Sequence, residues 1–147
     1  MVYEIYTEGV CIPDVGGFAF KCFDEAGEVW REGSGWMEDT TINRMDLYAI
    51  IQALKSILAD DFECATIYSD DDYIVYAFNK GLINLWQCNG WKDDDEDNVK
   101  DKDLWQELIN LVNLKGNIKF EDVDCNHPVA KSVHDAASLA LRKHLLK

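Results

Sequence analysis

The sequence is poor in basic residues and in proline, and it has no long apolar run. Its 147 residues include 14 Lys and Arg against 28 Asp and Glu, which gives a formal net charge of −14. A surface this acidic disfavours non-specific attraction to phosphate backbones or anionic membranes. No apolar stretch approaches the roughly 20 residues of a membrane span. The first residues lack the basic start and apolar run of a signal peptide. We therefore expect a cytoplasmic, monomeric protein without a membrane segment.

The cysteines lack a pairing pattern. Five are scattered along the chain, and none forms a CxxC pair. An odd and scattered set is typical of reduced thiols, and not of a disulfide framework or a zinc site. The content of 48% hydrophobic and 12% aromatic residues fits one globular domain over residues 1–147.

Hydrophobic periodicity predicts the element order βββ-α-β-α-α-β-α. The predicted strands are residues 2–10, 16–23, 28–37, 65–70 and 117–124, and the predicted helices are residues 40–61, 72–81, 102–116 and 131–147. Three consecutive strands predict an antiparallel meander. The two later strands follow helices, so we expect them to be parallel additions to the same sheet.

Four acids fall near the ends of these elements. Glu8 precedes a predicted turn at Gly9, Asp46 lies in the first turn of the first helix, Asp70 closes the fourth strand, and Asp135 opens the last helix. Carboxylates brought together at one edge of a sheet repel one another unless cations lie among them. Mg²⁺ prefers such oxygen ligands, and a pair of ions can promote phosphodiester hydrolysis. Each acid also has a purely structural explanation. Asp46 could be an acid favoured by the helix dipole in the first turn, and Asp70 could cap the end of its strand.

Four segments in register resemble the type 1 RNase H (ribonuclease HI) family over nearly the whole chain. They read IYTEGVC, TTINRMDLYAIIQAL, IYSDDDYIV and NGWKDDDEDNVKDKDLWQEL. The resemblance implies an RNase H-like α/β fold, with a five-stranded mixed sheet in the order 3-2-1-4-5, the first three strands antiparallel, and helices on both faces. It also implies two Mg²⁺ ions, with Mn²⁺ as a substitute. The implied reaction cleaves the RNA strand of an RNA–DNA hybrid and leaves a 3′-hydroxyl and a 5′-phosphate.

The resemblance assigns the catalytic and metal-binding positions unevenly. Asp70 matches its family acid, whereas Glu8 stands where the family has Asp, and Asp46 where it has Glu. The fourth acid falls on Asp135 or on the adjacent His134, and we favour Asp135 for its chemistry. His127 corresponds to the loop histidine that helps the product leave, although a surface histidine before a proline turn explains it equally well.

The substrate-binding positions implied by the resemblance are Thr41, Asn43, Arg44, Trp86 and Trp91. In the family, the region around the last two residues is a basic protrusion that grips the DNA strand. Here it carries the acid run DDDED at 93–97. Losing phosphate contacts predicts weak intrinsic affinity for a hybrid. The acid run also fits a solvated turn, or a surface for a basic protein partner. In the last case the chain would be a catalytically degenerate binding module.

Overall fold

The computed structural model describes residues 1–146, in which five strands form one sheet in the order β3-β2-β1-β4-β5. The strands are β1 (Val2–Ile12), β2 (Val15–Phe23), β3 (Val29–Met37), β4 (Cys64–Ser69) and β5 (Ile118–Asp122). The helices are α1 (Ile42–Ser56), α2 (Asp72–Asn79), α3 (Leu82–Cys88), α4 (Lys102–Lys115) and α5 (Pro128–Leu145). The pairs β1–β2 and β2–β3 are antiparallel, and the pairs β1–β4 and β4–β5 are parallel. The predicted sheet order and strand directions are confirmed.

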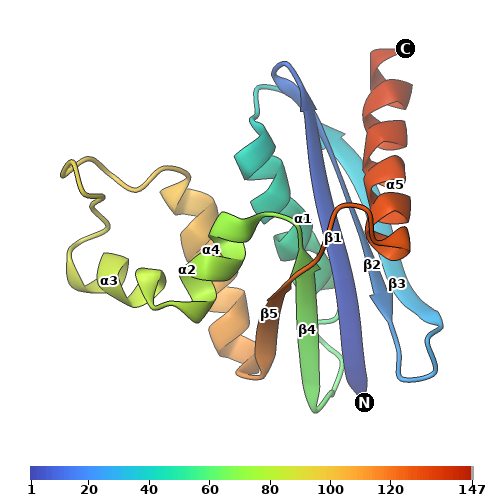
Figure 1. The fold of residues 1–147 in the computed structure, drawn as a ribbon, viewed down its shortest axis with the longest axis horizontal. Coiled ribbons are helices and arrows are strands. Elements are labelled where there is room, and N and C mark those ends of the chain that lie inside the picture. The colour runs from blue at the N-terminus through green and yellow to red at the C-terminus, as the bar shows by residue number, and fades with distance from the viewer. Residues whose placement is uncertain (147) are drawn as a thin grey trace.

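Helices cover both faces of the sheet (Figure 1). On one face, α1 buries Ile50 and Ile51 completely against the core. On the other face, α5 lies across β1 and β2, where Val133 and Leu141 pack with Tyr6. Apolar residues three and four positions apart supply the buried stripe of each helix, as an amphipathic helix requires. The two helices therefore cover β1 and β2 from opposite faces of the sheet.

β1 continues through Gly9 to Ile12, so the predicted turn at Gly9 is wrong. Glycine is needed there for a different reason. A Cβ on Gly9 would lie 2.7 Å from the backbone nitrogen of Asp46 and 2.7 Å from the backbone carbon of Met45. Those distances are far below van der Waals contact, so only glycine lets α1 approach β1 this closely. Glu8 thus lies inside a strand, and the next residue, Gly9, lies directly against Asp46 of α1.

The helices differ from the prediction in two places. Three helices separate β4 from β5 instead of two, because α2 ends at Asn79 and a further short helix, α3, begins directly after Gly81, which has a φ of 78°. The last helix begins at Pro128 and not at residue 131, with His127 as its N-cap. Proline suits the first turn of a helix, where its missing N–H has no partner to lose. Residue 147 lies outside the described residues. No helix within residues 1–146 is long and apolar enough to cross a membrane.

We call residues 82–101, which comprise α3 and the loop after it, the protrusion; its loop extends away from the sheet in Figure 1. The acid run forms an ordered turn within it. The carboxylate of Asp93 accepts hydrogen bonds from the backbone N–H groups of Asp95 at 2.9 Å and Asp97 at 3.0 Å. Lys92 and Asn98 bridge the base of this turn. The acids are therefore presented by a closed loop.

Candidate active site

Glu8 and Asp70 face each other because of the register between β1 and β4. The parallel ladder pairs Tyr6 with Tyr68, whose rings stack at 4.7 Å. Two residues further on come Glu8, within β1, and Asp70, one residue past the end of β4, and a side-chain hydrogen bond joins the two. Glu8 is only 4% exposed. Burial, followed by the charge of Asp70 and a hydrogen bond between the two carboxyl groups, raises the pKa of Glu8 to about 8.

Asp46 joins this pair from α1. Its Oδ1 accepts a hydrogen bond from the backbone N–H of Gly9 at 3.0 Å. Burial raises the pKa of Asp46 to about 9, and a hydrogen bond with the Asp71 carboxyl group and the charges of Asp71, Asp70 and Glu8 add to the effect. Asp46 is the fifth residue of α1, so its predicted place in the first turn is wrong. The predicted acids on β1, α1 and the end of β4 lie within one electrostatically coupled cluster.

Asp71 belongs to the same cluster, although the sequence analysis did not select it. It is the N-cap of α2, and its Oδ1 accepts from the backbone N–H groups of Tyr73 at 3.1 Å and Ile74 at 3.3 Å. An Asp directly before a helical segment is a common N-cap signal. The run of three acids at 70–72, directly before a predicted helix, was therefore the sequence signal that could have identified Asp71. We call Glu8, Asp46, Asp70 and Asp71 the carboxylate cluster.

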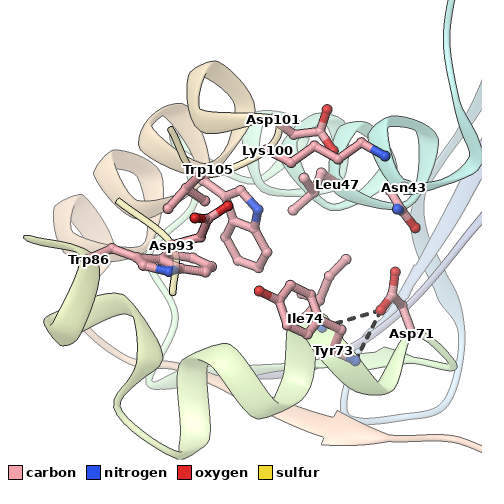
Figure 2. Close-up of a pocket in the computed structure, with 11 residues that line it drawn as sticks. Asn43, Leu47, Asp71, Tyr73, Ile74, Trp86, Asp93, Lys100, Asp101 and Trp105 are labelled. Atoms are coloured by element: carbon pink, nitrogen blue, oxygen red, sulfur yellow. Dashed lines mark hydrogen bonds between the residues drawn. The ribbon is translucent and has the colours of Figure 1, made fainter. Parts of the chain in front are cut away.

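A cavity of about 170 Å³ lies beside the cluster, between α1, α2 and the protrusion. In Figure 2, Asn43 and the ammonium group of Lys100 lie across the cavity from Asp71 and Tyr73. Three acids and one lysine are the charged residues of its lining, which are Asp71, Asp93, Asp101 and Lys100. The lining of the cavity is thus predominantly acidic.

Of the residues expected to bind substrate, Asn43 and Trp86 line this cavity. Asn43 is exposed and lines it. Thr41 is exposed but also caps α1, because its Oγ1 accepts from the backbone N–H of Arg44 at 3.2 Å. Trp86 is 3% exposed and packs on Trp91, with ring centroids 5.7 Å apart. Because Trp86 is buried, it forms part of the packed wall of the cavity. Arg44 is bound by acids of the loop before α4 and of α4 itself.

Comparison with known proteins identifies the family. A model of the RNase H family matches residues 1–140. The chain belongs to the RNase H family. The Ribonuclease H of Chlorobium luteolum is 37% identical over 142 residues, which cover 95% of this chain and 94% of its relative. The Ribonuclease H of Caldicellulosiruptor saccharolyticus is 42% identical over 123 residues, which cover 81% and 80%.

Solved structures share the fold. LC9-RNase H1, described as a type 1 RNase H with the type 2 active-site motif, has a TM-score of 0.83 at 22% identity, covering 97% of this chain and 72% of its own. LC11-RNase H1 in complex with an RNA/DNA hybrid has a TM-score of 0.74 at 18% identity, covering 97% and 99%. At these identities the likeness establishes the fold alone.

Asp135 lies further into α5 than the sequence predicted. Because α5 begins at Pro128, Asp135 is two turns into the helix, and its predicted place in the first turn is wrong. Its side chain is exposed, on the side roughly opposite the buried residues Val133 and Ala137. Asp135 is not among the charges that raise the pKa values of Glu8 and Asp46. The adjacent His134 is also exposed, on the flank of the buried stripe.

His127 serves the start of α5. Its Nδ1 accepts a hydrogen bond from the backbone N–H of Val129 at 3.1 Å, and its ring stacks on Tyr6 with centroids 5.3 Å apart. The preceding turn is tight, since the backbone N–H of His127 donates to the carbonyl of Asp124 at 2.9 Å. Through these contacts His127 caps and anchors the N-terminal end of α5.

The cluster suits a hard divalent ion in the chemistry of its donors. All its members are carboxyl groups, which are the ligands that Mg²⁺ and Mn²⁺ prefer. Burial first, and then the neighbouring carboxyl groups, raise the pKa values of Glu8 and Asp46. Within residues 1–146, no three Asp, Glu, His or Cys side chains already form a group able to enclose one ion. Ligation by three members of the cluster therefore requires side-chain rotations.

Proposed function

We propose that this RNase H family member cleaves the RNA strand of RNA–DNA hybrids, using two divalent metal ions held by Glu8, Asp46 and Asp70. The observation that carries the proposal is the meeting of these acids from β1, α1 and the end of β4 in one mutually repelling cluster, in which Glu8 is buried, Asp46 is half-buried and Asp70 is exposed. Asp71 supplies a fourth carboxylate in place of Asp135. Relatives named Ribonuclease H, at about 40% identity, support the reaction class.

The chain's own residues hold and tune this site. The backbone N–H of Gly9 holds Oδ1 of Asp46 in place. Near neutral pH, Glu8 and Asp46 retain protons because of their raised pKa values, and they must release them to bind a cation. Bound Mg²⁺ would activate the attacking water and stabilise the leaving oxygen of the phosphodiester. Activity should therefore increase from pH 6 to pH 9.

Weak intrinsic affinity for the hybrid is part of the proposal. The net charge of −14 repels a polyanion, and the turn at 93–97 places further acids on the protrusion. The only charged groups that line the cavity besides Lys100 are acids. Long-range repulsion of this kind slows association and weakens as salt screens it.

The direct test is cleavage of a labelled RNA–DNA hybrid with Mg²⁺ and with Mn²⁺ at low salt. Single-stranded RNA, duplex RNA and duplex DNA of the same sequence are the controls. We expect cleavage of the RNA strand of the hybrid alone, and faster cleavage with Mn²⁺, because Mg²⁺ demands near-ideal octahedral geometry. Absence of hybrid cleavage with either ion would refute the proposed function.

A second candidate function rests on the acid run. Its turn is closed by Asp93 and projects exposed carboxylates away from the sheet. A degenerate RNase H-like protein could present this turn to a basic protein partner. In that case the chain would bind a basic polypeptide such as polylysine at physiological salt, neutralising the turn would abolish that binding, and no hybrid would be cut.

A further inference from the structure

Arg44, on α1, is bound by two acids at the start of α4. Its Nη1 and Nη2 donate to the two carboxylate oxygens of Asp103 at 2.9 and 2.8 Å, and Nη1 also donates to Asp101 at 3.2 Å. Paired hydrogen bonds of this kind are the strongest arrangement between arginine and a carboxylate. The side chain of Asp101 is only 9% exposed, and that of Arg44 is 29% exposed. We call these three residues the clamp.

The backbone at Asp101 is adapted to the clamp. Asp101 is the N-cap of α4, yet it adopts the left-handed region at φ 61°, and its side chain makes no capping hydrogen bond. An N-cap Asp ordinarily accepts hydrogen bonds from the first N–H groups of its helix, as Asp71 does in α2. Here the carboxylate turns to Arg44 instead. The chain therefore gives up a local cap for a contact with α1.

The clamp lies at the edge of the cavity beside the carboxylate cluster. Asp101 and the two residues before it, Val99 and Lys100, line that cavity, as does Asn43, which precedes Arg44 on α1. Figure 2 places Asp101 and Lys100 over Leu47 and Asn43, opposite Asp71 and Tyr73. Holding Asp101 against α1 therefore fixes where the end of the protrusion lies relative to the cluster.

We propose that Arg44 is a positioning residue, which acts through Asp101 and Asp103 to hold the end of the protrusion against α1 and so sets the shape of the cavity. This reassigns Arg44, which the sequence analysis placed among the substrate contacts. Its guanidinium already makes three charged hydrogen bonds to these acids, which a phosphate would have to displace. The consequence for hybrid binding rests on the proposed function, whereas the placement of the protrusion does not.

The first test measures amide hydrogen exchange in peptides that cover residues 98–104. In Arg44→Gln, loss of the charged hydrogen bonds should speed exchange there by about tenfold or more. Arg44→Lys should lie in between, because an ammonium group cannot bind a carboxylate in the bidentate manner. Exchange in β1 and β4 reports whether the core remains folded. Unchanged exchange at 98–104 in Arg44→Gln overturns the inference.

The second test asks whether the acids of the clamp act by positioning the protrusion or only through their negative charge. It compares the direction in which two pairs of substitutions change KM for the hybrid. Asp101→Asn with Asp103→Asn removes two negative charges from the clamp, and Asp94→Asn with Asp95→Asn removes two from the exposed turn. If charge alone matters, both pairs lower KM for the hybrid. Positioning predicts that the clamp pair raises KM at little changed kcat, while the turn pair lowers it. A lower KM for the clamp pair contradicts the inference. If the wild-type chain cuts no hybrid, the proposed function fails, and amide exchange alone decides the role of Arg44.

Discussion

The backbone N–H of Gly9 donates a 3.0 Å hydrogen bond to the carboxylate of Asp46, and this contact joins β1 to α1 at the carboxylate cluster. It forms because Gly9 has no side chain to keep the helix away. One backbone position therefore sets both the packing of α1 on the sheet and the orientation of a cluster acid.

Replacement of Gly9 by Ala should both destabilise the protein and impair the site. The added Cβ would lie 2.7 Å from backbone atoms of α1, and overpacking of this kind typically costs about 1–3 kcal/mol. Urea unfolding measures the change. Gly27→Ala, where no atom lies within 4 Å of the added Cβ, shows the separate cost of alanine at a positive φ, which is about 1–2 kcal/mol. Wild-type stability in Gly9→Ala would show that Gly9 does not mediate a close approach.

In the absence of divalent ions, stability should fall as pH rises from about 5 to 9. The ordinary pKa of Glu8 is 4.5 and its folded value is about 8, while the values for Asp46 are 3.8 and about 9. Between these limits the folded state binds more protons than the unfolded state, so each group loses stabilisation as pH rises, by at most ~1.4 kcal/mol per pH unit.

Urea unfolding in chelator across this pH range measures that slope. Asp46→Asn should make the slope shallower, because the amide at position 46 cannot ionise in the folded or the unfolded state. Asp39→Asn, which alters an exposed acid outside the cluster, should leave it unchanged. A wild-type curve that rises over the same range would mean that the cluster does not hold protons.

Binding of Mg²⁺ should release protons near neutral pH. A cation and a proton compete for the same carboxylate oxygens, and two members of the cluster have pKa values raised to about 8 and about 9. Calorimetric titrations at pH 7 in buffers of different ionisation enthalpy count the protons released. We expect between one and two per protein in the wild type and fewer in Glu8→Gln. An enthalpy that is independent of the buffer would place the ion elsewhere.

Neutralising the exposed acids of the turn should tighten hybrid binding. Asp94, Asp95 and Glu96 can be changed to their amides while Asp93, which closes the turn, is kept. The affinity gain should be largest at low salt and shrink near physiological ionic strength, where the Debye length is about 8 Å. Fluorescence anisotropy with a labelled hybrid over a salt series tests this. A gain that does not depend on salt would indicate altered contacts and not long-range repulsion.

Periodicity predicted the strands and their directions, and the RNase H resemblance supplied the sheet order, from which the meeting of the acids of β1, α1 and the end of β4 follows. Asp135 was misplaced because the start of α5 depends on His127 and Pro128, whose capping role was not recognised. Gly9 resembled a turn residue because a close approach between elements distant in sequence leaves no local pattern. The pairing of Arg44 with Asp101 across 57 residues was hidden for the same reason.

The role of the carboxylate cluster is tested most directly by the single-turnover rate of hybrid cleavage in two variants, Asp70→Asn and Asp135→Asn, at saturating Mn²⁺. Both replace one carboxylate by an amide of the same shape. The account predicts that Asp70→Asn loses cleavage by at least about a thousandfold while remaining folded, and that Asp135→Asn stays within a few-fold of the wild type. Wild-type cleavage by Asp70→Asn, or loss of cleavage in Asp135→Asn alone, would contradict it.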